Sequence, residues 1–282
     1  MSTSVDTAFV RQYEREVHLA YQRGTSLIRG TVRTQSGVQG KSTTFQIIGA
    51  GAAGSKTRHG NVPVMNLEHT NVECTLVDRY AADYIDVLDL PKLNIDERGA
   101  ITKSAAMALG RETDNLLIAA MAAASNDTAI TVTNGATIRN SILEAREQMG
   151  IRDVPADGDW FGVISWRMES QLLTVPEFKD ADYVGPDLPF AKAMGTKLRS
   201  WLGIHWYVHN GLTKATNTRT GFLYHRDAVG HAIGSDVTSR IDYVPEKAAW
   251  FANSQMSMGA CLIDDDGVEK ITIDESSALA SS

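Results

Sequence analysis

The most suggestive short motif is the glycine-rich stretch FQIIGAGAAGSK at residues 45–56. An apolar, strand-like run leads into GAGAAG, which matches the G-x-G-x-x-G pattern of dinucleotide-binding loops. Such a loop requires a helix directly after it, because the N-terminal amides of that helix bind the pyrophosphate. The chain continues with SKTRHGNVPVMNLEHT, in which Gly60 and Pro63 would cost a helix about 1 and 3 kcal/mol relative to alanine. We therefore predict the tip of a long, flexible hairpin rather than a nucleotide site.

Histidine and cysteine, the usual ligands of zinc, do not form a convincing site. His205 and His209 in HWYVH have the i, i+4 spacing of zinc ligands on a helix. The residues between them favour a strand, in which positions i and i+4 lie about 13 Å apart and cannot share one metal. Cys74 and Cys261 are too few and too isolated for a disulfide framework or a zinc cluster. We expect each cysteine to be a small buried apolar residue in a reducing compartment.

A mixture of helices and strands must position these residues. Apolar residues at helical spacing predict helices at residues 9–27, 96–125 and 137–149, the second of which is rich in alanine. Apolar or alternating runs predict strands at residues 43–49, 71–78, 160–166 and 204–208. The sequence AAWFANSQMSMGACLIDDDGVEKITI predicts two antiparallel strands joined by the Asp-rich turn at residues 264–267. Residues 151–240 contain most of the tryptophans and read as a second compact lobe.

The composition is that of a globular protein, with 282 residues of which 43% are hydrophobic and 22% charged. The longest wholly apolar run, at residues 116–124, is shorter than the roughly 20 residues of a membrane-spanning helix. The N-terminus lacks the apolar core of a signal peptide, so we expect a soluble, unexported protein. The formal net charge of −7 argues against a protein that coats nucleic acid, because such a protein must neutralise many phosphates.

Positive charge gathers at the N-terminal end of the chain. Residues 1–41 carry six basic side chains against three acidic ones. The stretch RGTVRTQSGVQGKST at residues 29–43 has too few apolar residues to pack a core by itself, and we expect it to be an arm that lies on another surface. Charge alone favours a solvated helix face over contact with nucleic acid.

Four stretches, in this order, resemble a known family. They are GKSTTFQIIG at residues 40–49, KSAAMALGRETDNLLIAAM at residues 103–121, GFLYHRDAVG at residues 221–230 and SMGACLIDDDGVEKITI at residues 257–273. Each looks like the corresponding stretch of the major capsid proteins of tailed bacteriophages, which have the Hong Kong 97-type fold. The likeness is greatest to the short-tailed, T-seven-like phages and covers most of the chain, with residues 151–215 the least similar.

The resemblance implies an α+β fold of the Hong Kong 97 type with four parts. They are an N-terminal arm at residues 1–40, an extended hairpin at 41–80, a peripheral domain at 81–154 and 241–282 that contains the long helix, and an axial domain at 155–240. The implied function is that of a major capsid protein, which self-assembles into hexamers and pentamers of the icosahedral shell around a double-stranded DNA genome. The resemblance implies a structural protein without enzyme activity, cofactor or metal.

Two sets of residues gain a role from the resemblance. The hairpin would contact a neighbouring subunit through Gly49, Gly51, Gly54, Lys56, Arg58 and Gly60. The arm would face the packaged genome through Arg11, Arg15, Arg23, Arg29 and Arg33, which would contact phosphates without reading sequence. In the type member of the fold a hairpin lysine forms an isopeptide bond with an asparagine of a neighbour. The short-tailed branch is not known for this cross-link, so we expect Lys56 to be a surface or inter-subunit charge.

The implied partners are other copies of the chain, a scaffolding protein and a portal during assembly, packaged double-stranded DNA and a potential decoration protein, with no membrane. The implied location is the virion shell, assembled in the cytoplasm of a host bacterium. Two alternatives remain open at this stage. An encapsulin, the shell of a bacterial compartment, shares the fold but encloses cargo enzymes, and a nucleotide-binding enzyme would use the GAGAAG loop.

Overall fold

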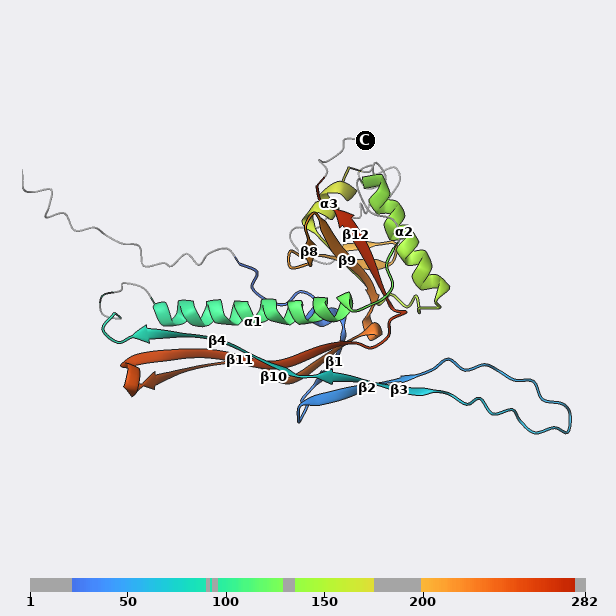
Figure 1. Cartoon of the computed structure of the whole chain (residues 1–282), viewed down its shortest axis with the longest axis horizontal. Helices are drawn as coiled ribbons and strands as arrows, with labels where there is room; N and C mark the ends of the chain where they lie inside the picture. The colour runs from blue at the N-terminus through green and yellow to red at the C-terminus, as the bar shows by residue number, and fades with distance from the viewer. Residues whose placement is uncertain (1–21, 90–91, 93–95, 129–134, 175–198, 277–282) are drawn as a thin grey trace, which may run out of the picture. The chain divides into compact units, whose positions relative to one another are not determined.

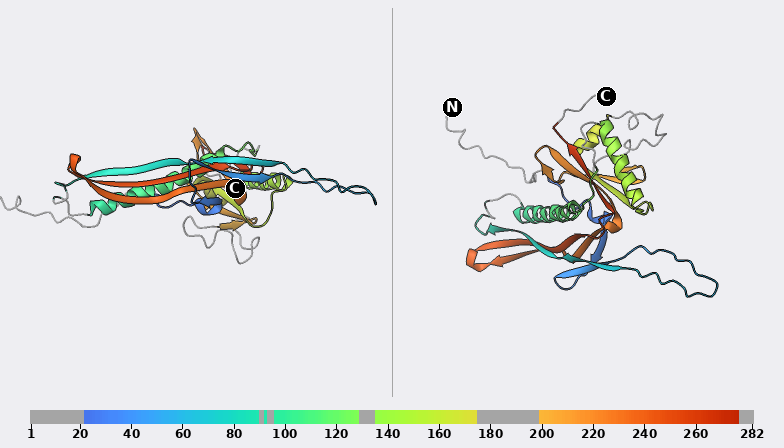
Figure 2. Two further views of the ribbon diagram at one scale, coloured as in Figure 1. Left: turned by 90° about the horizontal axis from the view of Figure 1, so that it is seen from below. Right: turned by 45° about the vertical axis from the view of Figure 1, so that its right-hand side comes forward.

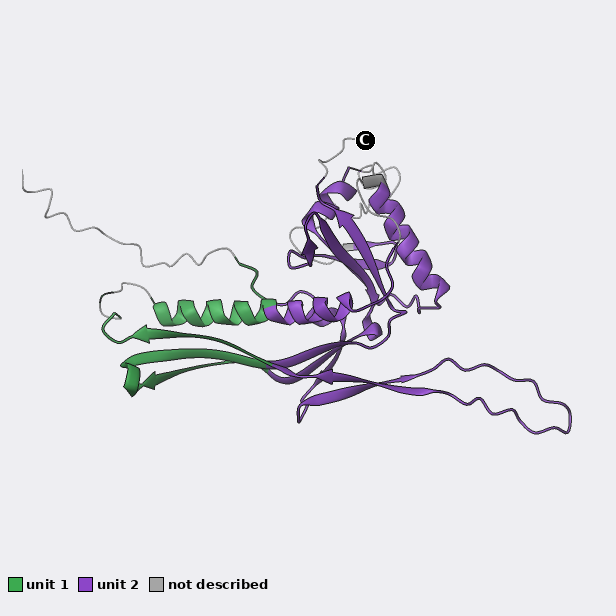
Figure 3. Ribbon diagram, viewed as in Figure 1, with its two compact units in different colours: residues 1–25, 78–111, 236–256 green, residues 26–77, 112–235, 257–282 purple. Residues whose placement is uncertain are grey.

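A computed structural model of the chain describes residues 22–89, 92, 96–128, 135–174 and 199–276. Of the helix predicted at residues 9–27, residues 9–21 lie outside them, and residues 22–27 are not helical, so the prediction is wrong for that part. The chain divides into two compact units (Figure 3). Unit 1 comprises residues 1–25, 78–111 and 236–256, and unit 2 comprises residues 26–77, 112–235 and 257–282. Three long elements contribute residues to both units: α1 (Glu97–Ala122), β10 (Val229–Val244) and β11 (Ala249–Leu262).

Unit 2 contains a six-stranded mixed sheet (Figure 1). Its strands are β5 (Trp160–Ile164), β6 (Arg199–Trp201), β7 (Ile204–Val208), β8 (Lys214–Ala215), β9 (Thr218–His225) and β12 (Val268–Asp274). Their order is β12-β9-β5-β7-β6, with β8 paired to β9. Strands β5 and β7 are parallel, whereas the other pairs are antiparallel. Strands β5 and β7 confirm two of the strands that the sequence predicts.

Both faces of this sheet are covered, which explains why β5 is buried at every position. Successive residues of a strand point to opposite faces. Trp160 and Ile164 therefore pack with α2 (Gly135–Ile151) and α3 (Trp166–Leu172), while Phe161 and Val163 pack with the C-terminal part of α1. A strand buried on both faces reads as a continuous apolar run without polar alternation.

Helix α2 confirms the predicted apolar stripe. The four residues that share this stripe are all fully buried against the sheet: Ile138, Ile142, Ala145 and Met149. Their spacing places them on one side of an α-helix, and the neighbouring Leu143 is 41% exposed. The helix therefore contributes one face to the core and leaves the other to solvent or a partner.

Unit 1 contains most of β4 (Val77–Asp86), the N-terminal part of α1, and the ends of β10 and β11, which are joined by the 3₁₀ turn η5 (Pro245–Lys247). Helix α1 begins after Asp96, whose side chain accepts a hydrogen bond from the Gly99 amide at 3.2 Å, as helix-capping residues do. The Arg98 guanidinium lies 4.1 Å from the centre of the Trp250 ring, which attaches the helix to β11. The long alanine-rich helix predicted at residues 96–125 is thus confirmed.

A four-stranded sheet has the order β1-β10-β11-β4. Its edge strand β1 (Arg33–Ser36) runs parallel to β10, with Arg33 opposite Gly230. A short 3₁₀ turn, η2 (Arg29–Thr31), precedes β1, and the turn η4 (Arg226–Ala228) precedes β10. Part of the stretch that the sequence suggests is a loose arm is therefore hydrogen-bonded to the chain's own sheet.

The predicted C-terminal hairpin is wrong. Strand β11 lies between β10 and β4, whereas β12 pairs with β9 in the other sheet. The Asp-rich turn at residues 264–267 therefore connects two sheets, and the amides of Ile263 and Asp264 both donate to the Ala228 carbonyl, at 2.8 and 3.2 Å. Two apolar runs on either side of an Asp-Gly turn can form a hairpin or can belong to two different sheets. The turn residues do not determine which strand the second run pairs with.

Candidate functional site

The predicted hairpin consists of a paired base and a long extension. The base is the antiparallel pair β2 (Ser42–Ile48) and β3 (His69–Thr75), which confirms both predicted strands. Residues 49–68, here called the hairpin extension, contain no helix and run clear of the rest of unit 2 (Figures 1 and 2). The Gly49 amide donates to the Glu68 carbonyl at 2.8 Å, and at the far end the Gly60 amide donates to Thr57 at 3.0 Å. Lys56 directly precedes this terminal turn.

The base is held by a small apolar cluster within unit 2. Phe45 of β2 and Cys74 of β3 are buried together with Ala232 of β10 and Ile263, and we call these four residues the hairpin-base cluster. The Leu76 amide also donates to the Lys41 carbonyl at 2.9 Å, which closes the open end of the pair. The point at which the hairpin leaves the sheet is therefore fixed by burial, unlike the extension.

The glycines of GAGAAG have a steric role in this hairpin. A Cβ atom on Gly51 would lie 2.3 Å from the Met65 Sδ, and one on Gly54 would lie 2.6 Å from the Pro63 Cγ. Glycine therefore lets the outgoing limb pass directly beside the side chains of the returning limb. No helix N-terminus follows the loop, so the amides that would bind a pyrophosphate are missing from this segment.

The returning limb exposes apolar side chains. Val62 and Val64 are 70% and 84% exposed, and Met65 and Leu67 are exposed to a smaller extent. A two-stranded ribbon is marginally stable alone, and an apolar surface of this kind marks an interaction site. Lys56 and Arg58, near the tip, are exposed as well. The hairpin extension is thus the candidate binding surface of the chain.

The predicted arm residues fall in different places. Arg11 and Arg15 lie outside the described residues. Arg23, in unit 1, accepts a hydrogen bond at its carbonyl from the Arg111 side chain at 3.1 Å. Arg29 and Arg33 belong to unit 2, where Arg33 is exposed on β1 and its guanidinium lies 5.8 Å from the centre of the Phe45 ring.

A buried polar cluster that the sequence did not reveal anchors the segment just before β1. Asp114 of α1 and His209, directly after β7, are both fully buried, with Asp114 Oδ2 and His209 Nε2 2.9 Å apart. Asp114 also accepts hydrogen bonds from the Ser26 hydroxyl at 2.5 Å and from the amides of Leu27 and Ile28 at 3.2 and 3.3 Å. Burial alone would raise the pKa of Asp114, but the hydrogen bonds from His209 and Ser26 outweigh it and lower this pKa below its ordinary value.

Ser26, Asp114 and His209 are the residue types of a hydrolytic triad, but their arrangement differs. The Ser26 hydroxyl donates to Asp114, so it is not positioned for proton transfer to His209. The other ring nitrogen of His209, Nδ1, accepts a hydrogen bond from the Gly211 amide at 3.0 Å, which places the proton on Nε2. The three residues form a structural clip that holds residues 26–28 against α1.

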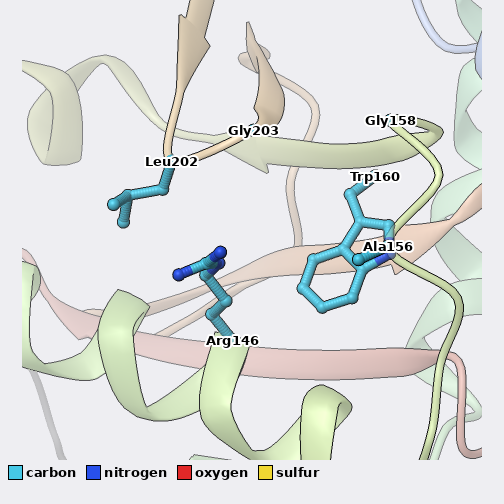
Figure 4. A pocket seen from close by; sticks show the side chains of 6 residues that line it. All are labelled: Arg146, Ala156, Gly158, Trp160, Leu202 and Gly203. Carbon is cyan, nitrogen blue, oxygen red and sulfur yellow. The ribbon is translucent and has the colours of Figure 1, made fainter.

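Two cavities in the described part of unit 2 do not suit a nucleotide. One, of about 530 Å³, lies where the hairpin leaves its base and is lined by four aspartates, Asp153, Asp227, Asp264 and Asp266, against the single arginine Arg152. Four carboxylates would repel phosphate groups. A smaller cavity of about 170 Å³ lies between Arg146, Trp160 and Leu202 (Figure 4) and is below the usual size of ligand pockets.

The two histidines of HWYVH lie in separate environments, and only His205 is a strand residue as predicted. His205 lies in β7 with its ring 5.7 Å from the Phe161 ring, whereas His209 binds Asp114. In the parts of the chain that the structure describes, no group of three or more histidine, cysteine, aspartate or glutamate residues could hold a metal ion. None of the helices described there is long and apolar enough to cross a membrane.

Comparison with known proteins points to one family. The sequence matches a family model described as phage capsid protein over residues 5–275. No curated protein matches the sequence. The fold is similar to the capsid structure of cyanophage P-SCSP1u, at 17% identity and a TM-score of 0.76, with 98% of this chain and 96% of that chain covered. A structure of Mycobacterium phage Che8 has 14% identity and a TM-score of 0.75, with 96% and 98% covered.

The mature capsid of bacteriophage PhiM1 gives a third match, at 13% identity and a TM-score of 0.73, with 94% of this chain and 92% of that chain covered. These likenesses confirm the α+β fold of the Hong Kong 97 type that the sequence predicts. The family model spans nearly the whole chain, including both units and the hairpin extension. The chain therefore belongs to the phage capsid protein family.

Proposed function

We propose that copies of this phage capsid protein assemble into the hexamers and pentamers of an icosahedral shell around double-stranded DNA, and that the hairpin extension lies on a neighbouring copy. The observation that carries the proposal is the set of exposed apolar side chains on an extension that has no core of its own. The same surface occurs on every copy, so its contacts would repeat around a closed symmetric assembly.

The size of the effect follows from the four exposed side chains, Val62, Val64, Met65 and Leu67. Complete burial of such a side chain contributes about 1.5–3 kcal/mol. Because these four are already partly covered and an interface does not bury them completely, we expect on the order of 4 kcal/mol from each extension. A shell contains many such contacts, so modest energies per hairpin are sufficient for a stable particle.

Electron microscopy of the purified chain tests assembly directly, and we expect shells, tubes or capsomers. The variant Val62→Ser/Val64→Ser/Met65→Ser should fold normally and fail to assemble, because these side chains lie outside the core. The matched control Asn61→Ser/Asn66→Ser changes two exposed polar residues of the same limb and should assemble normally. If the apolar variant assembled at the same protein concentration as the unaltered chain, the proposed role of the extension would be refuted.

The basic residues support a second part of the proposal, in which the N-terminal segment faces the packaged genome. Arg33 is exposed on the edge strand β1, and the segment carries an excess of positive charge in a chain whose net charge is −7. Reversing the charge of Arg11, Arg15, Arg23, Arg29 and Arg33 should reduce DNA retention by assembled particles, because phosphate contacts supply sequence-independent affinity. Unchanged retention in particles that still assemble would refute this part.

The remaining partners belong to the same proposal: assembly in the cytoplasm of a host bacterium with a scaffolding protein and a portal, and an outer decoration protein. Particles isolated from host cells distinguish this proposal from an encapsulin, because an encapsulin would contain cargo protein instead of DNA.

Denaturing electrophoresis of mature particles tests whether Lys56 forms a covalent cross-link. We expect single chains, whereas a ladder of covalent oligomers would indicate an isopeptide cross-link. A structural role also implies that nucleotides leave the thermal midpoint of the chain unchanged.

A further inference from the structure

We propose that Cys74 and Cys261 form an intrachain disulfide site, at which oxidation ties the hairpin base to β11. These are the only two cysteines among 282 residues, and the fold brings them together from distant parts of the sequence. Both lie in unit 2, and neither is paired in a disulfide in the structure. The inference concerns contacts inside one chain and does not depend on the assembly proposed above.

The two thiols are direct neighbours. Cys74 of β3 is fully buried in the hairpin-base cluster, and the partly exposed Cys261 of β11 packs against that cluster. The two side chains are close enough for each to shift the pKa of the other. A disulfide requires two cysteines whose side chains already meet, because wider separations need backbone movement. The two cysteines are far apart in the sequence but adjacent in the fold, so the expectation that they are isolated is wrong.

Two glycines of the neighbouring strands make this contact sterically feasible. A Cβ atom on Gly259 would lie 2.2 Å from the Thr75 carbonyl oxygen and 3.3 Å from the Cys74 Sγ. Cys261 is two residues further along β11 and so faces the same side as Gly259. A Cβ atom on Gly230 would lie 3.0 Å from the Cys261 Sγ. Any larger residue at position 259 would push β3 away from β11 and separate the thiols.

The two cysteines differ in how readily they ionise. The interaction with Cys261 lowers the pKa of the Cys74 thiol, whereas the interaction with Cys74 and burial raise that of Cys261, so Cys74 is the more readily ionised of the two. Thiolates are the nucleophilic form of cysteine. A peroxide is small enough to approach from the side of the partly exposed Cys261.

The reaction balances with one peroxide for each disulfide. The Cys74 thiolate attacks an oxygen of hydrogen peroxide, the O–O bond breaks, and hydroxide leaves, which gives a sulfenic acid. The Cys261 sulfur then attacks the Cys74 sulfur, so that an S–S bond forms and the S–O bond breaks. The departing hydroxide and the thiol proton of Cys261 form water. Two thiols and one hydrogen peroxide thus give one disulfide and two water molecules.

Peptide mapping of the folded chain after hydrogen peroxide treatment tests the proposal. The protein is then denatured in the presence of a maleimide, which blocks the remaining thiols including the buried Cys74, and digested without reductant. We expect the peptide with Cys74 to be linked to the peptide with Cys261, and both thiols to become unreactive at the same rate. In Cys261→Ser we expect no linked peptide and a Cys74 sulfenic acid that dimedone traps when the protein is denatured in its presence. This variant changes a partly exposed residue, so it should fold.

The thermal midpoint provides an independent readout. A bond that closes so long a loop should raise the midpoint of the oxidised chain on the order of 10 °C, and a reductant should reverse the shift. Links between different chains, or equal linkage rates in folded and urea-unfolded protein, would show that the fold does not direct the reaction. An unchanged midpoint after complete linkage would overturn the claim that the bond ties the hairpin base to β11.

Discussion

The substitution Asp114→Asn examines the buried clip that holds residues 26–28 against α1. In the native cluster four donors point at one carboxylate: the Ser26 hydroxyl, the amides of Leu27 and Ile28, and His209 Nε2. Asparagine keeps one oxygen, which can still accept from residues 26–28. Its NH₂ group then faces the Nε2–H of His209 at 2.9 Å, so two donors meet without an acceptor. His209 cannot reverse its tautomer without losing the bond from Gly211.

The expected loss is large because Asp114 and His209 are both fully buried. A hydrogen bond to a charged group contributes about 1.5–3 kcal/mol, and a buried donor left unpaired costs about 1–3 kcal/mol more. We therefore expect Asp114→Asn to lower the free energy of unfolding by about 3–5 kcal/mol. For a chain of this size the thermal midpoint should fall on the order of 10 °C.

Urea denaturation of the unassembled chain measures this loss, and Asp157→Asn is the matched control. Asp157 also pairs with a histidine, His225, at 3.2 Å, but its side chain is half-exposed, so its loss should be far smaller. The pKa of Asp114 lies below its unfolded value of about 3.9, so the contribution of its charge is present above that pH and disappears as the pH falls through the folded pKa. The difference between the two proteins should therefore shrink in acid. A loss within about 1 kcal/mol at neutral pH, or an equal loss in the control, would contradict this reasoning.

Three further predictions concern packing. Gly162→Ala should destabilise unit 2 by about 1–3 kcal/mol in urea denaturation, because the new Cβ would lie 2.3 Å from the Trp206 ring. An unchanged free energy of unfolding would mean that the ring moves without an energetic cost. Ile142→Ala should cost about 2–5 kcal/mol, whereas Leu143→Ala, its exposed neighbour on α2, should stay within about 0.5 kcal/mol; equal losses would contradict the assigned helix face. Arg98→Ala should lower the free energy of unfolding by about 0.5–2 kcal/mol, because it removes the contact with the Trp250 ring, and Arg98→Lys should retain part of that stability. If calorimetry shows no loss for Arg98→Ala, the contact does not contribute to stability.

Local patterns in the sequence predicted the elements that have a clear period. The helix stripe through Ile138 and Met149, the apolar run of β5 and the two strands of the hairpin base all follow from spacing along a short segment. Pairing partners were not accessible in this way. Strand β12 joins β9 rather than β11, and β1 joins β10, because strand pairing depends on residues far apart in the chain.

The same limit applies to the polar clip and the two cysteines. Asp114 and His209 are 95 residues apart and belong to no common motif, so only the fold reveals that they meet. A signal was present in the composition, since a histidine at the end of an apolar strand and an aspartate in an apolar helix both need buried partners. This signal says that a partner must exist, but it does not identify which residue it is.

Under the proposed function, folding and assembly depend on different residues, and this separation has a physical reason. The sheet of unit 2 is covered on both faces by helices of the same chain, so its buried core lies within one copy. Val64 in the extension contacts no such core and is 84% exposed, so replacing it should leave the free energy of unfolding unchanged. The hairpin-base cluster is expected to affect both folding and assembly. Phe45 and Cys74 are buried in the chain's own core, and the strands that carry them lead directly into the extension. A change in this cluster should therefore alter both the stability of the chain and the direction in which the extension leaves it.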